Sequence, residues 1–244
     1  MQDVTRRTNT QLLLDAALEL VWPTRCSGCE STGSLLCNNC KATLKHIAIE
    51  YACKQCGAPF GYLNCTECYR REGKEQHVFT AAVSALELEE LSGRVIVLYK
   101  DNNEHRLSHI LAEYLFGALP HSWLSWADAL TWVPVDRKTL RRRGFDHMKP
   151  IAQELSQKMQ LPALELLNKQ PRFDQRNLNR KQRGENLKES FILSGASSID
   201  NHSPSNVLII DDVITTGATL NAAALKLVEG GVSEVRVASI ARAW

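Results

Sequence analysis

Eight cysteines confined to residues 26–68 constrain this chain more than any other feature, and none occurs in the 176 residues that follow. They form four Cys-x-x-Cys pairs, Cys26/Cys29, Cys37/Cys40, Cys53/Cys56 and Cys65/Cys68. Two residues between cysteines let both thiolates of a tight turn face one ion, and two such turns complete a tetrahedron. The eight thiolates therefore predict two structural zinc ions, which would fold a small segment that lacks a core of its own.

Other uses of these cysteines fit the sequence less well. Disulfides need an oxidising compartment, and the segment 11–22 does not resemble a secretory signal, because Asp15 and Glu19 interrupt its apolar run. We interpret that segment as a short amphipathic helix ended by Pro23, and we expect a cytoplasmic protein. A redox role suits one Cys-x-x-Cys pair but not four of them.

The spacing does not settle which cysteines share an ion. A sequential scheme gives the first four cysteines one ion and the last four the other, whereas an interleaved scheme crosses the pairs. We favour the sequential scheme because it needs loops of only seven and eight residues.

The chain is long enough for a second domain beside the cysteine module. Its 244 residues are 44% hydrophobic and 23% charged, as in soluble globular proteins. No apolar run approaches the roughly 18 residues that span a bilayer, so we expect no membrane insertion. The polar stretch 70–76 is interpreted as a linker. We therefore expect an N-terminal helix in residues 1–24, a double zinc-ribbon domain in 25–70 and a larger domain in 77–244.

Apolar patterning in the larger domain alternates between strands and helices. Strands are predicted at 79–86, 130–135, 207–210 and 234–240, and helices at 89–100, 106–119, 148–159 and 218–229. A strand, a helix and a second strand at the C-terminus imply a right-handed parallel crossover. The fold class is therefore α/β, with a doubly wound parallel sheet.

The segment 207–219 gives the strongest indication of function. Four apolar residues precede Asp211 and Asp212, and a turn rich in threonine, 215–219, leads into the next helix. Ligands of open α/β sheets bind at the carboxyl ends of strands. Exposed N–H groups of the turn and of the helix start suit a phosphate, and Gly217 allows close approach. Carboxylates repel that phosphate but accept hydrogen bonds from sugar hydroxyls, so a phosphorylated ribose fits both parts.

This segment closely resembles the 5-phosphoribosyl-1-diphosphate (PRPP) motif of type I phosphoribosyltransferases. The resemblance implies that the acidic pair contacts ribose hydroxyls, that the turn holds the 5-phosphate and that Mg²⁺ accompanies PRPP. The PRPP-binding residues implied are Asp211, Asp212, Val213, Ile214, Thr215, Thr216, Gly217, Ala218 and Thr219. The implied fold is the type I phosphoribosyltransferase fold, whose hood would come from about residues 77–119, with Tyr99 and Lys100.

The cysteine module followed by this domain resembles the ComF/GntX family, which is associated with competence, transformation and DNA uptake in bacteria. The likeness covers about residues 20–244, including 53–59, 133–135, 142–147 and 175–191. Asp146 and His147 stand where the family commonly has Asn and Gln. The family implies single-stranded DNA, a competence helicase or DNA-processing proteins as partners.

Two basic segments lie in an otherwise acidic chain. Residues 137–149 and 169–188 each carry a net charge of +5, although the whole chain carries only +2. This pattern is expected where an anion binds. The first segment is predicted to be a loop that binds diphosphate, and the second a flexible loop that closes over the ligand. The diphosphate candidates are Arg137, Lys138, Arg142, Arg143 and Gly144, and the flexible-loop candidates are Arg176, Arg180, Arg183 and Asn186. A solvated helix start and a disordered surface loop are the alternatives.

Three functions remain open from the sequence. The chain is a Mg²⁺-dependent phosphoribosyltransferase of unknown acceptor, a DNA-uptake protein that binds a phosphoribosyl ligand, or a single-stranded-DNA adaptor without turnover. In a further possibility, the zinc ribbons would bind a partner protein instead of DNA. No residue is assigned a catalytic role.

Metal analysis tests the cysteine interpretation directly. We expect two zinc ions per chain in freshly reduced protein, because eight thiolates form two complete tetrahedra. Elemental analysis by mass spectrometry, normalised to protein concentration, gives the ratio. A ratio of one or zero would contradict the prediction.

Overall fold

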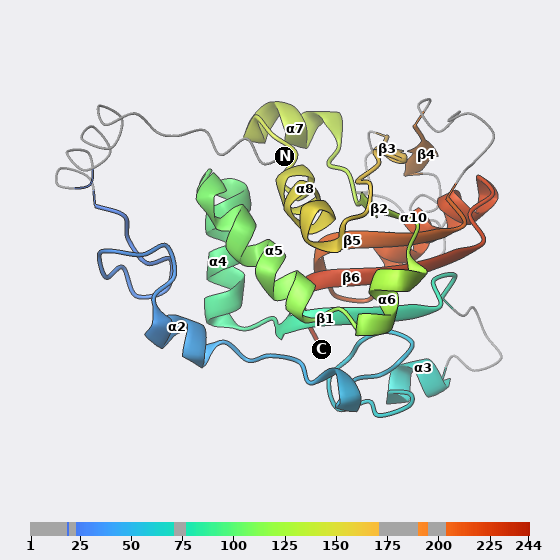
Figure 1. Ribbon diagram of the computed structural model, residues 1–244, viewed down its shortest axis with the longest axis horizontal. Coiled ribbons are helices and arrows are strands. Elements are labelled where there is room, and N and C mark those ends of the chain that lie inside the picture. Colours follow the sequence, from blue (N-terminus) through green and yellow to red (C-terminus); the bar gives the residue numbers. More distant parts are fainter. Residues whose placement is uncertain (1–18, 20–22, 71–76, 171–189, 195–203) are drawn as a thin grey trace, which may run out of the picture. The chain divides into compact units, whose positions relative to one another are not determined.

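The fold is described from a computed structural model, which covers residues 19, 23–70, 77–170, 190–194 and 204–244 (Figure 1). The predicted N-terminal helix, most of the linker and the flexible-loop candidates lie outside these residues. The chain divides into two compact units, Met1–Leu44 and Lys45–Trp244, which are treated separately below. Within the described ranges, no helix combines the length and apolar character that crossing a membrane requires.

The described chain contains both helices and strands. The helices are α2 (Asn38–Thr43), η1 (Ile49–Tyr51), α3 (Thr66–Arg70), α4 (Glu90–Asp101), η2 (His105–Leu107), α5 (Ser108–Gly117), α6 (His121–Trp126), α7 (Arg137–Arg143), α8 (Met148–Met159) and α10 (Ala218–Glu229). The strands are β1 (Ala81–Glu87), β2 (Ala129–Trp132), β3 (Leu167–Lys169), β4 (Phe191–Leu193), β5 (Asn206–Ile214) and β6 (Glu234–Arg242). Each strand and helix that the patterning predicts in the larger domain is present, with ends shifted by a few residues.

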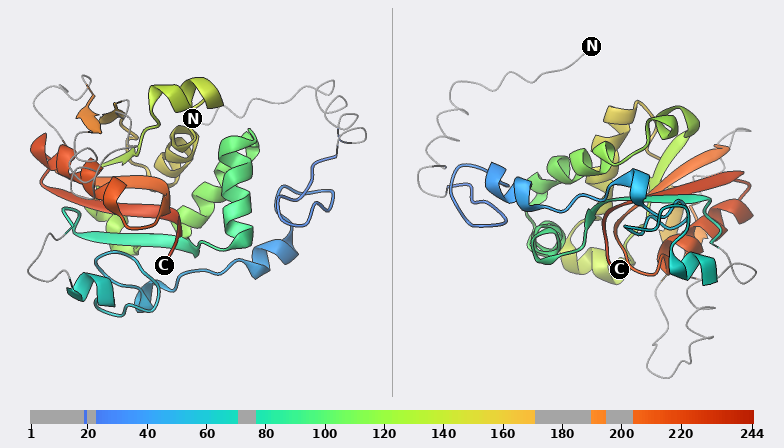
Figure 2. Two further views of the ribbon diagram at one scale, coloured as in Figure 1. Left: turned by 180° about the vertical axis from the view of Figure 1, so that it is seen from behind. Right: turned by 90° about the horizontal axis from the view of Figure 1, so that it is seen from below.

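A four-stranded parallel sheet in the order β1-β6-β5-β2 forms the centre of the larger unit. The four apolar residues 207–210 of β5 are fully buried, so both faces of this strand are covered. Helix α5 packs on β1 and β6, and α8 packs on β2 and β5, whereas α10 packs on β5 and β6. Figure 2 shows α10 on the opposite face of the sheet from α5 and α8. The observed architecture is the predicted doubly wound α/β fold.

The region expected to form the hood has a different role. Its first part is strand β1, which pairs with β6 inside the sheet, and its remainder forms α4, η2 and α5. Tyr99 is 1% exposed and donates a hydrogen bond from its hydroxyl to the carbonyl oxygen of His147. The expectation failed because residues 82–86 are buried and pair with β6 as an edge of the central sheet. The sequence also did not predict α6 or the antiparallel pair β3–β4.

The second cysteine group is packed into the larger unit. Residues 45–47 extend the sheet beside β1, through hydrogen bonds from Ile47 N to Ala85 O (3.0 Å) and from Glu87 N to Lys45 O (2.9 Å). A Cβ atom on Gly57 would lie 3.0 Å from the carbonyl oxygen of Ala82, so the chain after Cys56 is in close contact with β1. The boundary between the compact units therefore falls between the two cysteine groups. The domain limits 25–70 and 77–244 stay predictions about independent folding.

Gly61 provides a test of this packing. A Cβ atom there would lie 2.5 Å from Cβ and 2.8 Å from Cα of Cys53. We expect Gly61→Ala to lower the free energy of unfolding of the larger unit by roughly 1–3 kcal/mol, because backbone must shift to make room. Urea unfolding followed by circular dichroism measures the change.

The matched control is Gly117→Ala at the end of α5, where a Cβ atom would meet nothing within 4 Å. That variant should stay within about 1 kcal/mol of the parent protein. Equal stability of both variants would show that the segment around Gly61 does not pack as described.

Candidate phosphate site and candidate metal sites

The eight cysteines gather into two groups of four. The sulfur atoms of Cys26, Cys29, Cys37 and Cys40 lie within 4.8 Å of one another, as do those of Cys53, Cys56, Cys65 and Cys68. The grouping follows the sequential scheme favoured from the sequence. Sγ atoms are 3.7 Å apart between Cys29 and Cys37, and 3.6 Å apart between Cys56 and Cys65. A tetrahedral zinc ion with Zn–S bonds of 2.3 Å separates its sulfurs by about 3.8 Å, so both groups are consistent with structural zinc.

Backbone N–H groups support one thiolate in each group. The N–H of Cys37 lies 3.2 Å from Sγ of Cys26, and that of Cys65 lies 3.2 Å from Sγ of Cys53. Burial acts to raise the pKa of Cys26, but backbone donors outweigh it and lower this pKa to about 6. The Cys56 thiol and backbone donors lower the pKa of Cys53 to about 4, against the effect of burial. Thiolates are the form that binds metal, so the lowered pKa values of Cys26 and Cys53 favour metal binding in each group.

A separate polar cavity of about 290 Å³ lies at the carboxyl ends of β2 and β5. Both strands run in parallel, so the segments that follow them meet at one edge of the sheet. The lining residues are Val133, Pro134, Val135, Asp136, Thr139, Arg143, His147, Lys169, Asp211, Asp212, Val213 and Thr219. The predicted acidic pair and the predicted diphosphate segment thus face the same cavity.

The acidic pair lies inside β5 rather than after it. The strand continues to Ile214, and Asp211 pairs with Ser239 of β6. Because successive side chains of a strand point to opposite faces, the two carboxyl groups have different surroundings. The expectation of a strand that ends at Ile210 was wrong because pairing with β6 extends β5 through the polar residues.

Asp212 is held by two basic side chains. Its Oδ2 atom lies 2.7 Å from Nζ of Lys100 and 3.2 Å from Nε2 of His147. His147 precedes α8 and is buried, and its Nδ1 lies 3.4 Å from Arg143, which also forms an ion pair with Asp101 at 2.9 Å. Polar side chains from α4, from α7 and from the residue before α8 therefore fix this carboxylate at the end of β5.

The surroundings shift the two pKa values in opposite directions. Burial raises the pKa of Asp211 well above its usual value of 3.8, and the negative charge of Asp212 raises it further. Burial also acts against ionised Asp212, but the hydrogen bond with His147 and the charge of Lys100 outweigh it and lower that pKa. Asp212 therefore ionises at lower pH than Asp211 does.

The turn after β5 has the features of a phosphate cradle. Gly217 adopts a φ of 75°, and a Cβ atom there would lie 3.5 Å from the ring of His77 and 3.6 Å from that of Phe79. Thr216 Oγ1 accepts a hydrogen bond from Ala218 N at 3.3 Å, and the N-cap residue Gly217 makes no side-chain capping hydrogen bond. N–H groups beyond Ala218 in the first turn of this 12-residue helix suit an anion.

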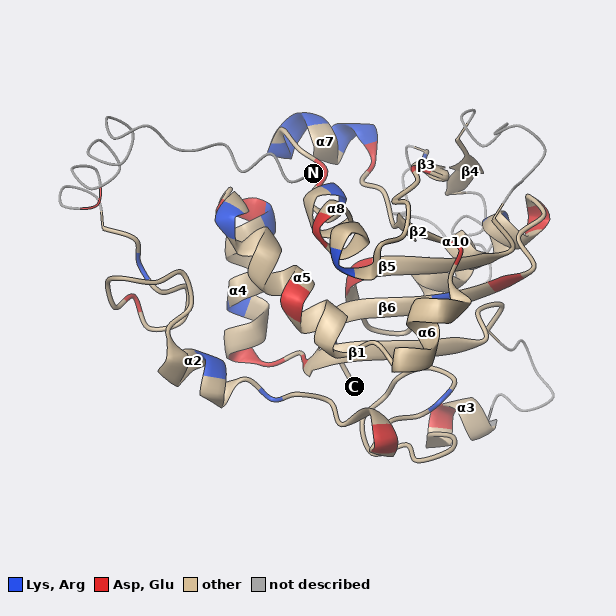
Figure 3. Ribbon diagram, in the orientation of Figure 1, with Lys and Arg blue, Asp and Glu red and all other residues tan. Residues whose placement is uncertain are grey.

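The first basic segment is a helix, not the expected loop. Asp136 accepts hydrogen bonds from the N–H and the hydroxyl of Thr139, both at 2.9 Å, and this N-cap starts α7. Gly144 ends α7 with a φ of 82°. Of the diphosphate candidates, Arg143 lines the small cavity, whereas Lys138, Arg142 and Gly144 are exposed and line neither cavity described here. Figure 3 shows that lysine and arginine cover most of α7.

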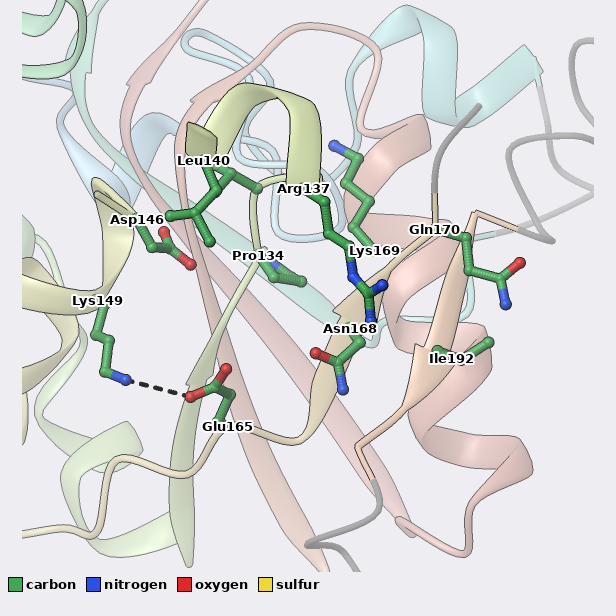
Figure 4. Close-up of a pocket in the computed structure, with 11 residues that line it drawn as sticks. Pro134, Arg137, Leu140, Asp146, Lys149, Glu165, Asn168, Lys169, Gln170 and Ile192 are labelled. Atoms are coloured by element: carbon green, nitrogen blue, oxygen red, sulfur yellow. Dashed lines mark hydrogen bonds and ion pairs between the residues drawn. The ribbon is translucent and has the colours of Figure 1, made fainter. Parts of the chain in front are cut away.

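A larger cavity of about 580 Å³ adjoins the first and shares Pro134, Val135 and Lys169 with it (Figure 4). Arg137 and Lys169 lie near Pro134, and the ion pair between Lys149 and Glu165 (3.3 Å) closes one end. The other lining residues are Leu140, Asp146, Asn168, Gln170 and Ile192.

His147 and Lys169 line the small cavity and Lys100 is paired with Asp212, but the sequence patterns identify none of the three as a site residue. The sequence places Lys100 in an expected hood, His147 at a departure from the family and Lys169 at the start of a basic segment. They come from α4, the start of α8 and β3, which are distant in sequence. No local motif identifies them, because only the folded sheet brings them together.

The acidic pair should respond to substitution with opposite signs. At neutral pH we expect Asp211→Asn to raise the free energy of unfolding, because it removes a buried carboxyl group that resists ionisation. Asp212→Asn should lower the free energy of unfolding by roughly 1–3 kcal/mol, because it removes the charge that balances Lys100. Urea unfolding between pH 3 and pH 8 measures both effects.

The pH dependence provides the internal control. The penalty at Asp211 develops as pH rises above 3.8, the usual value, since the unfolded state ionises there first. The stabilisation from Asp212 is present above 3.8 and is lost as pH falls through its lowered folded-state pKa. If both substitutions changed the free energy of unfolding in the same direction at pH 7, this description would be contradicted.

Comparison with known proteins supports the two-part organisation. A family model described as a double zinc ribbon domain matches residues 17–71, and one described as a phosphoribosyl transferase domain matches residues 141–243. The structure is also similar to orotate phosphoribosyltransferase from Aeropyrum pernix, with 14% identity, 65% of this chain and 80% of that chain covered, and a TM-score of 0.32. That similarity is too low to add to the fold assignment.

Relatives cover most of the chain. Competence protein F of Haemophilus influenzae is 30% identical over 85% of this chain and 90% of its own length. Competence protein ComFC of Streptococcus pneumoniae is 25% identical over 86% and 88%, and DNA utilization protein YhgH of Escherichia coli is 27% identical over 78% and 83%. With its four cysteine pairs and its phosphoribosyltransferase sheet, the chain belongs to the ComF family of competence proteins.

Proposed function

We propose that this protein serves DNA uptake and binds PRPP, or a related phosphoribosyl compound, in the small cavity. One observation carries the proposal. The acidic pair of β5, Thr219 from the predicted phosphate segment and the cationic side chains of Arg143 and Lys169 come together around one cavity at the carboxyl edge of the sheet. A ribose with phosphate groups at both ends matches this order of acidic and cationic groups.

Each part of the ligand would meet a different element. The 5-phosphate would bind the N–H groups of the turn 215–219 and of the start of α10. The ribose hydroxyls would donate to the carboxylates of β5, of which Asp212 is already fixed by Lys100 and His147. The diphosphate would lie toward Arg143 and Lys169, since cationic side chains suit that anion.

The carboxylates at the cavity suit Mg²⁺ only together with a ligand. Asp136 is engaged by Thr139, and Asp212 by Lys100 and His147, so the described residues do not form a complete cation cage. Mg²⁺ usually keeps several waters and binds one or two carboxylates together with phosphates of the ligand. When bound in this way, Mg²⁺ supplies positive charge to the diphosphate. Asp211 is the carboxylate best placed to join it.

Turnover is a second candidate function, and the larger cavity is the observation that favours it. A transferase needs a place for an acceptor beside the phosphoribosyl group, and the larger cavity adjoins the small one at Pro134 and Lys169. Its walls combine apolar residues with the amides of Asn168 and Gln170. These residues do not single out a purine, a pyrimidine or another acceptor, so binding is tested before turnover.

Isothermal titration calorimetry tests the ligand. We expect PRPP to bind in the presence of Mg²⁺, and the double variant Asp211→Asn/Asp212→Asn to bind it roughly tenfold or more weakly, because hydrogen bonds to charged groups contribute about 1.5–3 kcal/mol. The control is Glu165→Gln, which makes the same chemical change in the larger cavity. Equal PRPP affinity of the parent and of the folded double variant would falsify the placement.

The same titrations with short single-stranded DNA separate a nucleic-acid role from diphosphate binding. Arg141 and Arg142 are exposed and line neither cavity, so Arg141→Ala/Arg142→Ala should leave PRPP binding unchanged. If DNA lies along α7, that variant should bind DNA more weakly and with a smaller salt dependence. If no DNA binds even at low salt, the DNA contact belongs to a partner protein.

A further inference from the structure

Arg242, the last residue of β6, is a buried charge without a carboxylate partner in the described part of the chain. Its side chain belongs to a residue that is only 4% exposed. Its Nε and Nη1 atoms are buried and form no hydrogen bond to any described residue. The Nη2 atom lies 3.5 Å from Sγ of Cys56, a ligand candidate of the second cysteine group.

A guanidinium buried without compensation is strongly unfavourable. Arginine keeps its proton at all ordinary pH values, so the side chain cannot remove its charge by titration. A negative group must therefore stand beside it. The second cysteine group provides one, because four thiolates around one Zn²⁺ carry a net charge of −2.

We propose that Arg242 is the internal counter-ion of the second four-cysteine site and that it couples metal binding there to the stability of the parallel sheet. Cys56 is 5% exposed, so the attraction acts in a region from which water is largely excluded. The first cysteine group differs in this respect. Its described hydrogen bonds to sulfur come from backbone N–H groups, from Ser31 and from other cysteines.

The position of Arg242 in the sheet provides the coupling. In the strand register, Arg242 lies beside Ile214 of β5 on one side and Glu87 of β1 on the other. Its carbonyl oxygen accepts a hydrogen bond from Leu88 N at 2.7 Å, and Ala243 N donates to Ile214 O at 2.9 Å. Arg242 is thus fixed between the two neighbouring strands, and removal of the metal would leave its charge unbalanced within the sheet.

Other contacts also join the second cysteine site to the sheet. The rings of Phe60 and Trp244 are 5.6 Å apart, so the chain between the two cysteine pairs meets the C-terminal residue. A Cβ atom on Gly57 would approach the carbonyl of Ala82, as described above. The second site therefore packs against β1 and the end of β6, and the counter-ion is one part of a larger contact.

Zinc affinity of the second site tests the charge directly. In the full-length chain, Cys26→Ser/Cys29→Ser removes the first site and leaves one zinc ion to measure by competition with a chelator. On this background we expect Arg242→Met to weaken zinc binding roughly 10–100-fold, as groups that support metal ligands do. Arg242→Lys keeps the charge and should remain within a few-fold of the parent. The control is Arg236→Met, on the same strand but over the ring of Trp126 at 4.0 Å.

The zinc affinities of the Met and Lys variants distinguish a packing role of Arg242 from a charge role. A packing role predicts that Met, which is apolar and of similar length, preserves affinity better than Lys does. A charge role predicts the reverse order. Unchanged affinity in Arg242→Met, or an equal loss in the Met and Lys variants, would overturn the proposal.

The main arm of a second measurement uses the unaltered protein, and a variant enters only as its control. Hydrogen exchange is followed by mass spectrometry before and after a chelator removes both zinc ions. We expect exchange to become at least tenfold faster in residues 211–214 and 239–242, where Arg242 joins the strands. The chain carrying Cys26→Ser/Cys29→Ser should keep the slow exchange until its remaining zinc is removed. Unchanged exchange in both strands of the zinc-free protein would also overturn the coupling.

Discussion

The parallel pairing of β5 with β2 and β6 is the constraint on which the candidate phosphate site and the arginine beside the second cysteine group depend. Parallel strands end at the same edge of a sheet, so the segments after all three strands are brought together. The segment after β2 leads to Asp136 and α7, the segment after β5 forms the Gly217 turn, and the end of β6 carries Arg242. The fully buried apolar core of β5 holds this edge in place.

Alternation along β5 gives two neighbouring carboxylates different roles. Asp212 faces Lys100 and His147, which stabilise its charge, whereas buried Asp211 resists ionisation beside it. An isolated pair of ionised carboxylates would be costly in this position. The protein reduces that cost because Lys100 and His147 stabilise ionised Asp212, and because burial raises the pKa of Asp211. Arrival of a ligand or a cation would alter this balance, so binding and ionisation of Asp211 are linked.

The two cysteine groups share a sequence pattern but differ in structural context. Both have sulfur separations suited to a tetrahedral ion. The second group belongs to the compact unit that contains the sheet, lies beside a buried arginine and is joined to β1 by residues 45–47. The first group belongs to the unit that precedes Lys45. Two sites with the same ligands can therefore contribute to stability in different ways.

The sequence by itself determined the features that depend on local spacing. Cysteine pairs two residues apart predict their own turns, and apolar runs bounded by turns predict the presence of β5 and β6 and both ends of α10. The acidic pair and the glycine-containing turn were recognisable because all of their parts lie within 13 consecutive residues, 207–219.

Only the tertiary structure decided which distant charges meet. Lys100, His147 and Lys169 reach the acidic strand from α4, α8 and β3, and no spacing along the chain records that contact. The extension of β5 through the acidic pair depends on its pairing with β6. Arg242 looks like an ordinary strand residue in the sequence. Its burial beside Cys56 arises from strand pairing and close packing, which act between segments far apart in the chain and leave no local pattern.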